Sequence, residues 1–342
     1  MHNAETPNTL RPFREATEPT DPSSPMMPLI DVRSLRKHFG AVLAVDDLSF
    51  SVNRGEVLGF LGPNGAGKST TMRIIAGFIA PSAGTAVVCG EDVRINPVAA
   101  KRHIGYVPEG SPLYGDMTPE GFLNFICNVR QMSRDERKKA VTAAIDRVQL
   151  GEVLHRRLDT LSKGFRRRVG LAQAILHDPD VLILDEPTDG LDPNQKHLVR
   201  ELIRSMGDTK AIIVSTHILE EVDAVCDRAI IIDRGRIVSD GTPLELHARS
   251  PDYNAVSLKV AKADAAKAIK VLKAVPDVAA VETVEEADGT TRLLVRPLEG
   301  AFIAEAVGAA LRNANLTATD MFSVIGTLDD VFWSVTMDRQ GR

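Results

Sequence analysis

The alternation of hydrophobic and polar positions predicts short strands and then mixed α/β structure. Residues 29–32 and 48–52 alternate between apolar and polar side chains, which is typical of antiparallel strands. Residues 57–61 form an apolar run that predicts a buried strand, and 70–76 follow with helical spacing. Residues 1–28 are rich in proline and polar side chains and have few large aliphatic ones, so we expect this tail to be disordered.

Helical spacing of apolar residues dominates 117–180, which we interpret as a helical insert. The apolar runs at 181–184 and 211–215 each border a predicted helix, and this arrangement favours further strands of a parallel sheet. The apolar runs at 229–232 and 237–238 are separated by a turn sequence, which predicts a hairpin.

The pattern changes beyond residue 250, where we expect a second domain. Its predicted elements are a strand over 255–260, a helix over 264–274, two strands around Asp288-Gly289, a helix over 302–313 and a last strand. The order β-α-β-β-α-β predicts a small α+β domain of the ferredoxin-like class over 251–342, with a closing segment at 328–335. The first domain is predicted over 29–250.

Composition narrows the range of functions. The chain has 342 residues, of which 44% are hydrophobic, and its 46 acidic and 41 basic residues give a net charge of −5. We therefore expect no nucleic-acid partner. Cys89, Cys127 and Cys226 have neither a disulfide-framework spacing nor a C-x-x-C metal spacing. No apolar run reaches the roughly 18 residues that cross a bilayer, so we expect a cytoplasmic protein that needs a partner for any role at a membrane.

A glycine-rich motif lies between the apolar run at 57–61 and the helix at 70–76, and it fits the pattern G-x-x-x-x-G-K-[ST] in full. Glycines let the backbone N–H groups of the loop converge on phosphate, and the following helix adds the positive end of its dipole. We expect a triphosphate here, with Lys68 on the β and γ phosphates and Ser69 on Mg²⁺. The residues expected to contact the nucleotide are Gly62, Pro63, Asn64, Gly65, Ala66, Gly67, Lys68, Ser69 and Thr70.

Two carboxylates, Asp185 and Glu186, end the apolar strand at 181–184. The carboxyl end of a parallel strand lies at the edge of the sheet where the phosphate loop also lies. We expect Asp185 to hold Mg²⁺, directly or through water, and Glu186 to polarise the water that attacks the γ phosphate. The alternative is that they cap a helix.

These motifs, together with Ser162 and Gly164, resemble the ATP-binding subunit of an ABC transporter over about residues 29–250. The segment containing Ser162 and Gly164 stands in the place of the LSGGQ signature, with Lys163 and Phe165 replacing the first glycine and the glutamine. The resemblance implies a P-loop NTPase fold with an antiparallel β subdomain and a helical subdomain. It also implies that Ser162 and Gly164 face ATP held by a second copy, so that two chains form a symmetric homodimer.

The resemblance assigns roles to four further residues. His217 is similar to the switch histidine that contacts the γ phosphate; otherwise it is a helix cap or a surface residue. Asp192 is similar to the D-loop aspartate at the dimer interface, although Asp-Pro also begins turns. Glu109 stands in the place of the Q-loop glutamine and keeps an oxygen for Mg²⁺ or water. Phe39 is similar to the aromatic that stacks on adenine, and the alternative is a core residue of the hairpin.

Two other groups of residues have simpler interpretations. Residues 166–168 are three arginines that follow a predicted helix N-terminus, and we interpret them as a solvated face without a role. Leu113, Tyr114, Met117 and Phe122 lie where members of the family meet the membrane subunit, and they form either a docking groove or part of the core.

The function implied by the resemblance is that of a subunit whose ATP-driven dimer closure powers a separate transmembrane permease at the cytoplasmic face of the inner membrane. The C-terminal extension resembles those of exporter-like bacterial systems, closest to the gliding-motility and nitrous-oxide-reductase-maturation transporters. The alternative is a soluble ABC ATPase that acts on a ribosome or a nucleic-acid complex. Such proteins usually carry a second nucleotide domain, long coiled coils or zinc insertions, which this sequence lacks. A non-catalytic nucleotide-binding regulator would be expected to lack Glu186 or His217.

Overall fold

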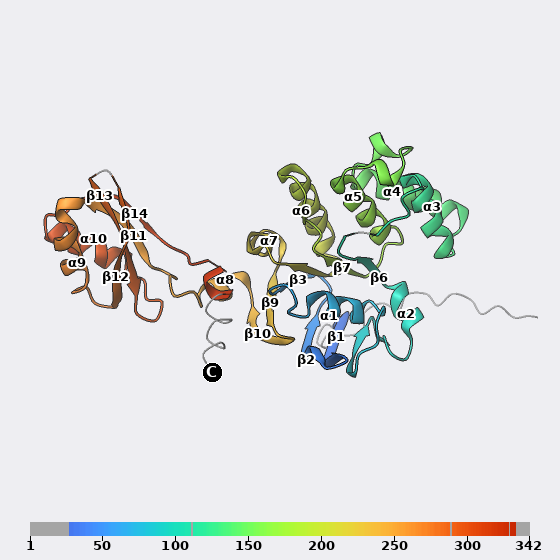
Figure 1. Cartoon of the computed structure of the whole chain (residues 1–342), viewed down its shortest axis with the longest axis horizontal. Helices are drawn as coiled ribbons and strands as arrows, with labels where there is room; N and C mark the ends of the chain where they lie inside the picture. Colours follow the sequence, from blue (N-terminus) through green and yellow to red (C-terminus); the bar gives the residue numbers. More distant parts are fainter. Residues whose placement is uncertain (1–26, 111, 288, 328, 333–342) are drawn as a thin grey trace, which may run out of the picture.

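The computed structural model describes residues 27–110, 112–287, 289–327 and 329–332. The tail predicted to be disordered therefore lies outside the described residues, apart from its last two positions. Figure 1 shows a larger part built around a central sheet and a smaller carboxyl-terminal part, which are joined near the short helix α8 (Pro243–His247). None of the helices in the described ranges has the length and apolar character of a membrane span.

The central sheet has six strands in the order β10-β9-β3-β8-β7-β6. The neighbours from β9 to β6 pair in parallel, and β10 pairs antiparallel with β9, which confirms the predicted parallel sheet and the predicted hairpin. Because parallel strands end at one edge, the segments that follow β3, β7 and β8 meet there. The strands are Glu56–Leu61 (β3), Ile104–Val107 (β6), Val181–Asp185 (β7), Ala211–Thr216 (β8), Arg228–Asp233 (β9) and Arg236–Gly241 (β10).

A second sheet, in the order β2-β1-β4-β5, consists of antiparallel pairs and confirms the antiparallel strands predicted near the start. Its inner face shares one hydrophobic core with the central sheet and α1, including Ile30, Phe50, Phe60 and Ile74. The strands are Ile30–Phe39 (β1), Val42–Val52 (β2), Ala83–Val88 (β4) and Glu91–Asp92 (β5). The phosphate loop therefore follows a strand, β3, that packs against this second sheet.

Four helices flank these sheets, and the first of them starts earlier than the sequence suggested. It begins at Lys68 and not at Thr70, because the helical turn already starts after Gly67. The helices are Lys68–Ile75 (α1), Pro97–Arg102 (α2), Pro193–Gly207 (α6) and Leu219–Val225 (α7).

The predicted helical insert contains α3 (Pro119–Val129), α4 (Arg134–Arg147) and α5 (Lys163–Ile175), with two short 3₁₀ turns at Gly151–Val153 and Leu158–Thr160. A hydroxyl caps each helix N-terminus by accepting a hydrogen bond from a backbone N–H in the first turn. The capping residues are Thr118, Ser133 and Ser162. The three helices lie together in Figure 1, with α5 next to β6 and β7 and with α3 and α4 farther from the central sheet.

The carboxyl-terminal part has the predicted order of elements and an antiparallel sheet in the order β12-β13-β11-β14. Its core lies between this sheet and two helices and contains Leu258, Leu272, Leu293 and Val307. The ferredoxin-like assignment and the limits of the two domains stay predictions. The elements are Val256–Ala261 (β11), Ala265–Leu272 (α9), Val278–Ala287 (β12), Thr290–Pro297 (β13), Ala304–Asn313 (α10) and Ala318–Ser323 (β14), with a 3₁₀ turn at Lys262–Asp264.

After β14 the chain returns to the larger part. Val331 is fully buried there in a cluster with Leu61, Leu219 and Leu246. Asp330 accepts hydrogen bonds from the backbone N–H and the hydroxyl of Thr327, at 3.0 and 2.6 Å. Part of the predicted closing segment is therefore part of the core next to β3.

Candidate active site

A cleft of about 560 Å³ opens at the carboxyl edge of the central sheet. It is lined by the phosphate loop, the start of α1, and the segments that follow β6, β7 and β8. The lining residues are Ala44, Pro63, Asn64, Gly65, Gly67, Lys68, Ser69, Thr70, Glu109, Glu186, Asp189 and His217. Most of the residues expected to act on ATP therefore surround one cleft.

The shape of the loop depends on its glycines. Gly67 has a φ of 106°, and a Cβ atom at this position would lie 2.5 Å from the carbonyl oxygen of Ala44. Gly65 also has a positive φ, of 82°, but faces open space. Since α1 begins directly after Gly67, the unpaired N–H groups of its first turn lie at the loop, where an anion is favoured.

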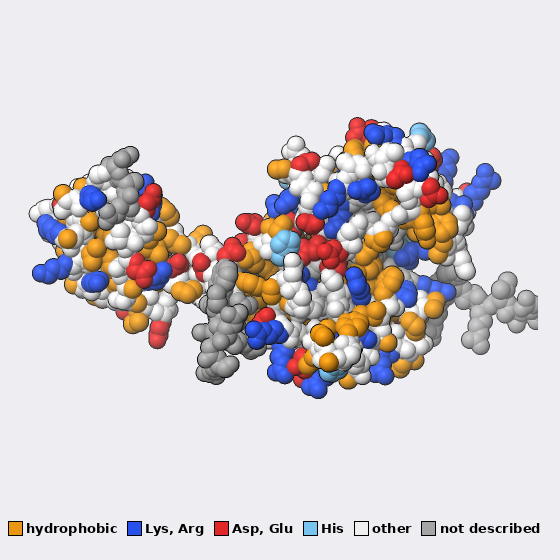
Figure 2. All heavy atoms as spheres, viewed as in Figure 1, with side chains coloured by type: hydrophobic (Ala, Val, Ile, Leu, Met, Phe, Trp, Pro, Cys, Tyr) orange, Lys and Arg blue, Asp and Glu red, His pale blue; other side chains and the backbone are white. Residues whose placement is uncertain are grey.

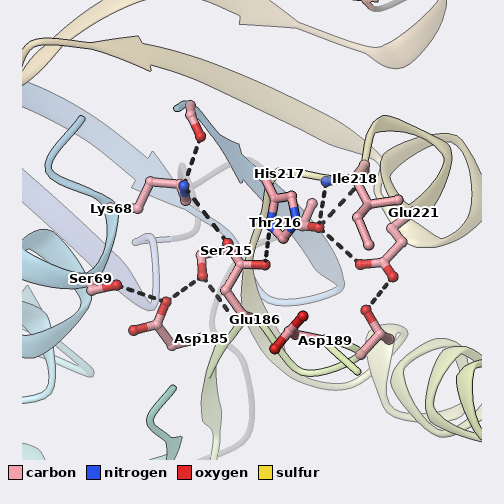
Figure 3. Close-up of polar contacts among 12 residues, drawn as sticks. Lys68, Ser69, Asp185, Glu186, Asp189, Ser215, Thr216, His217, Ile218 and Glu221 are labelled. Carbon is pink, nitrogen blue, oxygen red and sulfur yellow. Dashed lines mark hydrogen bonds and ion pairs between the residues drawn. The ribbon is translucent and has the colours of Figure 1, made fainter. Parts of the chain in front are cut away.

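Lys68 is only 6% exposed, and its Nζ lies between the loop and the end of β7. Nζ donates to the carbonyl oxygens of Gly62 at 2.7 Å and Pro63 at 3.3 Å, and it lies 3.7 Å from Oε1 of Glu186. Figure 3 shows the contact between Lys68 and Glu186. The ammonium group is thus held at the base of the cleft between backbone oxygens and a carboxylate.

Asp185 is fully buried at the end of β7. Its Oδ1 accepts hydrogen bonds from the hydroxyls of Ser69 at 3.2 Å and Ser215 at 2.5 Å (Figure 3). Its Oδ2 has no hydrogen-bond partner among the described residues. Leaving a buried carboxylate oxygen unpaired is costly, and oxygen atoms are the ligands that Mg²⁺ prefers. The Ser69 and Asp185 pair therefore fits a divalent cation.

Glu186 follows with a φ of 49°, a left-handed conformation that costs a non-glycine residue roughly 1–3 kcal/mol. Its N–H donates to Oγ of Ser215 at 3.0 Å, and its Oε2 lies 2.9 Å from Nδ1 of His217. Burial raises the pKa of the Glu186 carboxyl above its ordinary value, while His217 and Lys68 act in the opposite direction. A carboxylate in such a place is a suitable general base.

A buried network behind His217 was not predicted from the sequence. Glu221 is 2% exposed, and it accepts hydrogen bonds from the hydroxyls of Thr188 and Thr216, the latter at 2.9 Å. Thr216 Oγ1 also accepts from the N–H of Ile218 at 3.0 Å. Figure 3 shows that this network joins the end of β8 to the segment after β7. It fixes the backbone on both sides of His217, although no local motif marks it.

Six predicted nucleotide contacts are not among the residues that line this cleft, namely Phe39, Gly62, Ala66, Ser162, Gly164 and Asp192. Ser162 caps α5 through the N–H of Phe165 at 3.3 Å. Gly164 is buried at the start of α5, next to the side chain of Gln195. Asp192 caps α6 by accepting from the N–H of Gln195 at 2.9 Å.

The structure also bears on the predictions for Phe39 and for the three arginines at 166–168. Phe39 is 49% exposed at the end of β1, with Nζ of Lys37 5.0 Å from the ring centre, so it is not a core residue. Arg166 is exposed, but Arg167 and Arg168 are 4% and 8% exposed, so the prediction of a solvated face is wrong for both. They are buried because their guanidinium groups bond to backbone carbonyls of the interior.

Comparison with known proteins identifies the family. The model of the family described as "ABC transporter" matches residues 45–189. The Nod factor export ATP-binding protein I of Burkholderia orbicola (strain AU 1054) is 40% identical over 215 residues, which cover 63% of this chain and 71% of that protein. The chain belongs to the ATP-binding proteins of ABC transporters. As an ABC ATP-binding protein it binds and hydrolyses ATP and powers a transporter, and the soluble alternative is not favoured.

Solved structures agree with this assignment to the ABC ATPases. The structure of an ATP-binding subunit of an ABC transporter has a TM-score of 0.60 and 31% identity, and it covers 64% of this chain and 92% of that one. The dimeric ATP-binding cassette MJ0796 bound to ADP and Pi has a TM-score of 0.58 at 22% identity, covers 63% of this chain and 98% of that one, and shares the fold. The predicted P-loop NTPase fold is confirmed.

Proposed function

We propose that two copies of this chain form an ATP-dependent homodimer with two composite sites. The observation that carries this proposal is the separation of the motifs. The cleft of one chain is lined by Lys68, Glu186 and His217, whereas Ser162 and Gly164 lie outside it. Helix N-termini favour anions, so the start of α5 suits the phosphates of ATP held by the other copy. A symmetric pair supplies both halves of each site.

Within each site, Lys68 binds the β and γ phosphates, and Glu186 accepts a proton from the attacking water. His217 holds the Glu186 carboxylate in orientation and contacts the γ phosphate. Ser69 and Asp185, with Glu109 at the rim, would hold Mg²⁺, which supplies charge neutralisation at the phosphates when bound. Hydrolysis then proceeds by direct attack of water without a covalent intermediate. Phe39, exposed next to Lys37, stacks on adenine.

The permease docks in a second cleft, of about 430 Å³, between α1, β6 and α5. Phe78, Tyr106 and Leu113 give it an apolar lining, and Arg73, Lys101 and Arg130 add positive charge. Figure 2 shows hydrophobic side chains with Lys and Arg among them on the face near α2 and α3. An amphipathic helix of the permease with acidic residues at its rim fits such a groove. Of the four residues that the sequence predicted to form a docking groove, Leu113 lines this second cleft.

In this proposal the protein lies at the cytoplasmic face of the membrane, where it is bound to its permease. The Burkholderia relative is named a Nod factor export protein, which supports an exporter-like role. The C-terminal domain, over about 251–342, is an accessory element of the gliding-motility or nitrous-oxide-reductase-maturation type. The net charge of −5 gives no support for a nucleic-acid partner.

The test is affinity purification of the tagged chain from detergent-solubilised membranes, followed by mass spectrometry. A multi-span membrane protein in near-stoichiometric amount is the expected result. Phe78 and Phe302 are 62% and 72% exposed, but only Phe78 lines the groove. Phe78→Asp should lose the membrane protein, while the matched control Phe302→Asp keeps it. Recovery of ribosomal or DNA-bound proteins alone would contradict the proposal.

A further inference from the structure

Arg167 and Arg168 are neighbours on α5 that are buried in the same way but bind different parts of the protein. They are 4% and 8% exposed. A buried cation is tolerated only where several acceptors satisfy its donors, since an uncompensated charge in the interior is strongly unfavourable. Arginine can serve several carbonyl oxygens at once, because its five N–H donors form a rigid fork.

Arg167 bonds to the backbone on two segments at the edge of the central sheet. Nη1 donates to the carbonyl oxygen of Pro108 at 3.0 Å, next to Glu109. Nη2 donates to the carbonyl oxygens of Asp185, at 3.3 Å, and of Glu186. The helix that carries Arg167 begins at Lys163 and is capped by Ser162, the signature residue. One guanidinium group therefore connects the signature helix with the segments after β6 and β7.

The backbone of Glu186 is fixed from both sides by these contacts. Its N–H is held by Ser215, at 3.0 Å to Oγ and 3.1 Å to the carbonyl oxygen. Its carbonyl oxygen is held by Arg167. Glu186 has the left-handed φ of 49°, and such a conformation persists only where the surrounding contacts hold it. A change of this conformation would turn the carboxylate away from His217 and Lys68.

We propose that Arg167 is a positioning residue for hydrolysis, which holds the peptide of Glu186 so that its carboxylate faces the cleft. Because Arg167 is on α5, a displacement of the signature helix at dimer closure is passed directly to Glu186 and to the segment of Glu109. This inference rests on the proposed catalytic role of Glu186. It assigns to Arg167 an effect on the rate of hydrolysis and not on ATP binding.

Arg168 provides a matched control, because its contacts stay within the helical subdomain. Nη1 donates to the carbonyl oxygens of Val148 at 3.3 Å and Gln149 at 2.9 Å, and its guanidinium carbon lies 4.1 Å from the centre of the Phe165 ring. Arg167→Met and Arg168→Met each remove one buried cation from the same helix turn. Both variants should lower the melting temperature to a comparable extent.

Their kinetics should differ. Misplacement of a catalytic group typically costs about 10- to 100-fold in rate, so we expect this loss of kcat for Arg167→Met, with KM for ATP unchanged. Arg168→Met should keep kcat within about twofold of the parent. Arg167→Lys retains the charge but not the fork, and should give an intermediate kcat. In the Glu186→Gln background, Arg167→Met should cause no further loss, since both changes act through one group.

The inference is wrong if folded Arg167→Met keeps the parent kcat, or if Arg168→Met loses kcat equally. It is also wrong if Arg167→Met lowers the residual rate of Glu186→Gln. Should Arg167→Met not fold, Arg167→Gln and Arg168→Gln are compared in the same way. If Glu186→Gln itself hydrolyses ATP at the parent rate, the proposed catalytic role fails; if it is inactive while Arg167→Met is fully active, only this inference fails.

Discussion

Nδ1 of His217 lies 2.9 Å from Oε2 of Glu186, so the residues that directly follow two neighbouring parallel strands, β7 and β8, are in contact through their side chains. The His217 side chain is 49% exposed and that of Glu186 is 10% exposed. The contact therefore links the open part of the cleft with its buried base. A γ phosphate bound at Lys68 would lie next to this pair, where the geometry suits activation of water.

Replacing Glu186 with Gln should preserve ATP binding and nearly abolish hydrolysis. The amide keeps the size of the side chain but cannot accept a proton from water. ATP should then hold the closed dimer, which gel filtration detects as a shift to twice the mass. Glu220→Gln is the matched control, because Glu220 is exposed on α7 and does not line the cleft. Near-parental hydrolysis by Glu186→Gln would remove Glu186 from its proposed role.

The pH dependence of hydrolysis follows from the environment of Glu186. Burial raises the pKa of its carboxyl above the ordinary value of 4.5. The base must be ionised, so kcat should fall as the pH is lowered through this raised pKa, at a higher pH than for an exposed glutamate. His217 lowers the pKa of Glu186, so His217→Ala should move this acidic limb further upward. A pH profile of kcat at saturating ATP measures the position of the acidic limb in the parent and in His217→Ala. The same position in both proteins would contradict the predicted effect of His217 on Glu186.

Lys68→Ala should lose nucleotide binding, because the ammonium group is the cation that the phosphate loop holds at the base of the cleft. Isothermal titration calorimetry with ATP measures the affinity directly. Lys270→Ala removes an exposed lysine of α9 and should leave the affinity unchanged. Undiminished affinity of Lys68→Ala would count against the assignment of the loop.

The sequence predicted the groups whose chemistry depends on short motifs. Asp185 is the last residue of a strand of the central sheet, and the phosphate loop, Glu186 and His217 each follow such a strand, so the order of strands was enough to bring them to one edge of the sheet. Strand and helix periods likewise predicted the parallel sheet and the order of elements in the C-terminal part, because local patterns determine which side of an element is buried.

Interactions between distant segments were not predictable in this way. The bonds of Arg167 to Pro108 and Glu186, and those of Glu221 to Thr188, join residues far apart in the chain. A run of three arginines indicates a solvated face when judged from its composition, and only the fold shows that backbone carbonyls surround two of them. The same reason explains why the burial of Val331 beside β3 was not predicted.

Gly67→Ala should destabilise the protein more than Gly65→Ala. Both positions have positive φ, but only the added Cβ of Gly67 would meet a backbone atom, the carbonyl oxygen of Ala44, at 2.5 Å. Overpacking against backbone costs about 1–3 kcal/mol beyond the conformational strain that both variants share. Thermal unfolding of the two variants without nucleotide measures the difference. Equal melting temperatures would show that the loop relaxes away from Ala44.

Val331→Asp should destabilise the larger part of the protein although Val331 follows β14, the last strand of the C-terminal sheet, in sequence. Val331 is fully buried against Leu61 and Leu219, and an ionised carboxylate there has neither water nor a partner. A loss of about 2–5 kcal/mol is expected from such a buried charge. Val284→Asp is the control, because Val284 is 59% exposed on β12 and the same change there should shift the melting temperature little.

The readout for Val331→Asp has to distinguish the larger part from the C-terminal part. Leu61 directly precedes Gly62, and Leu219 follows His217 by two positions, so loosening this cluster acts on both segments that we propose contact ATP. Hydrogen exchange should therefore increase in β3 and α7 of the variant, whereas β11 and β13 keep their protection because their core does not contain Val331. Increased exchange confined to the C-terminal sheet would show that Val331 stabilises that domain alone, against this prediction.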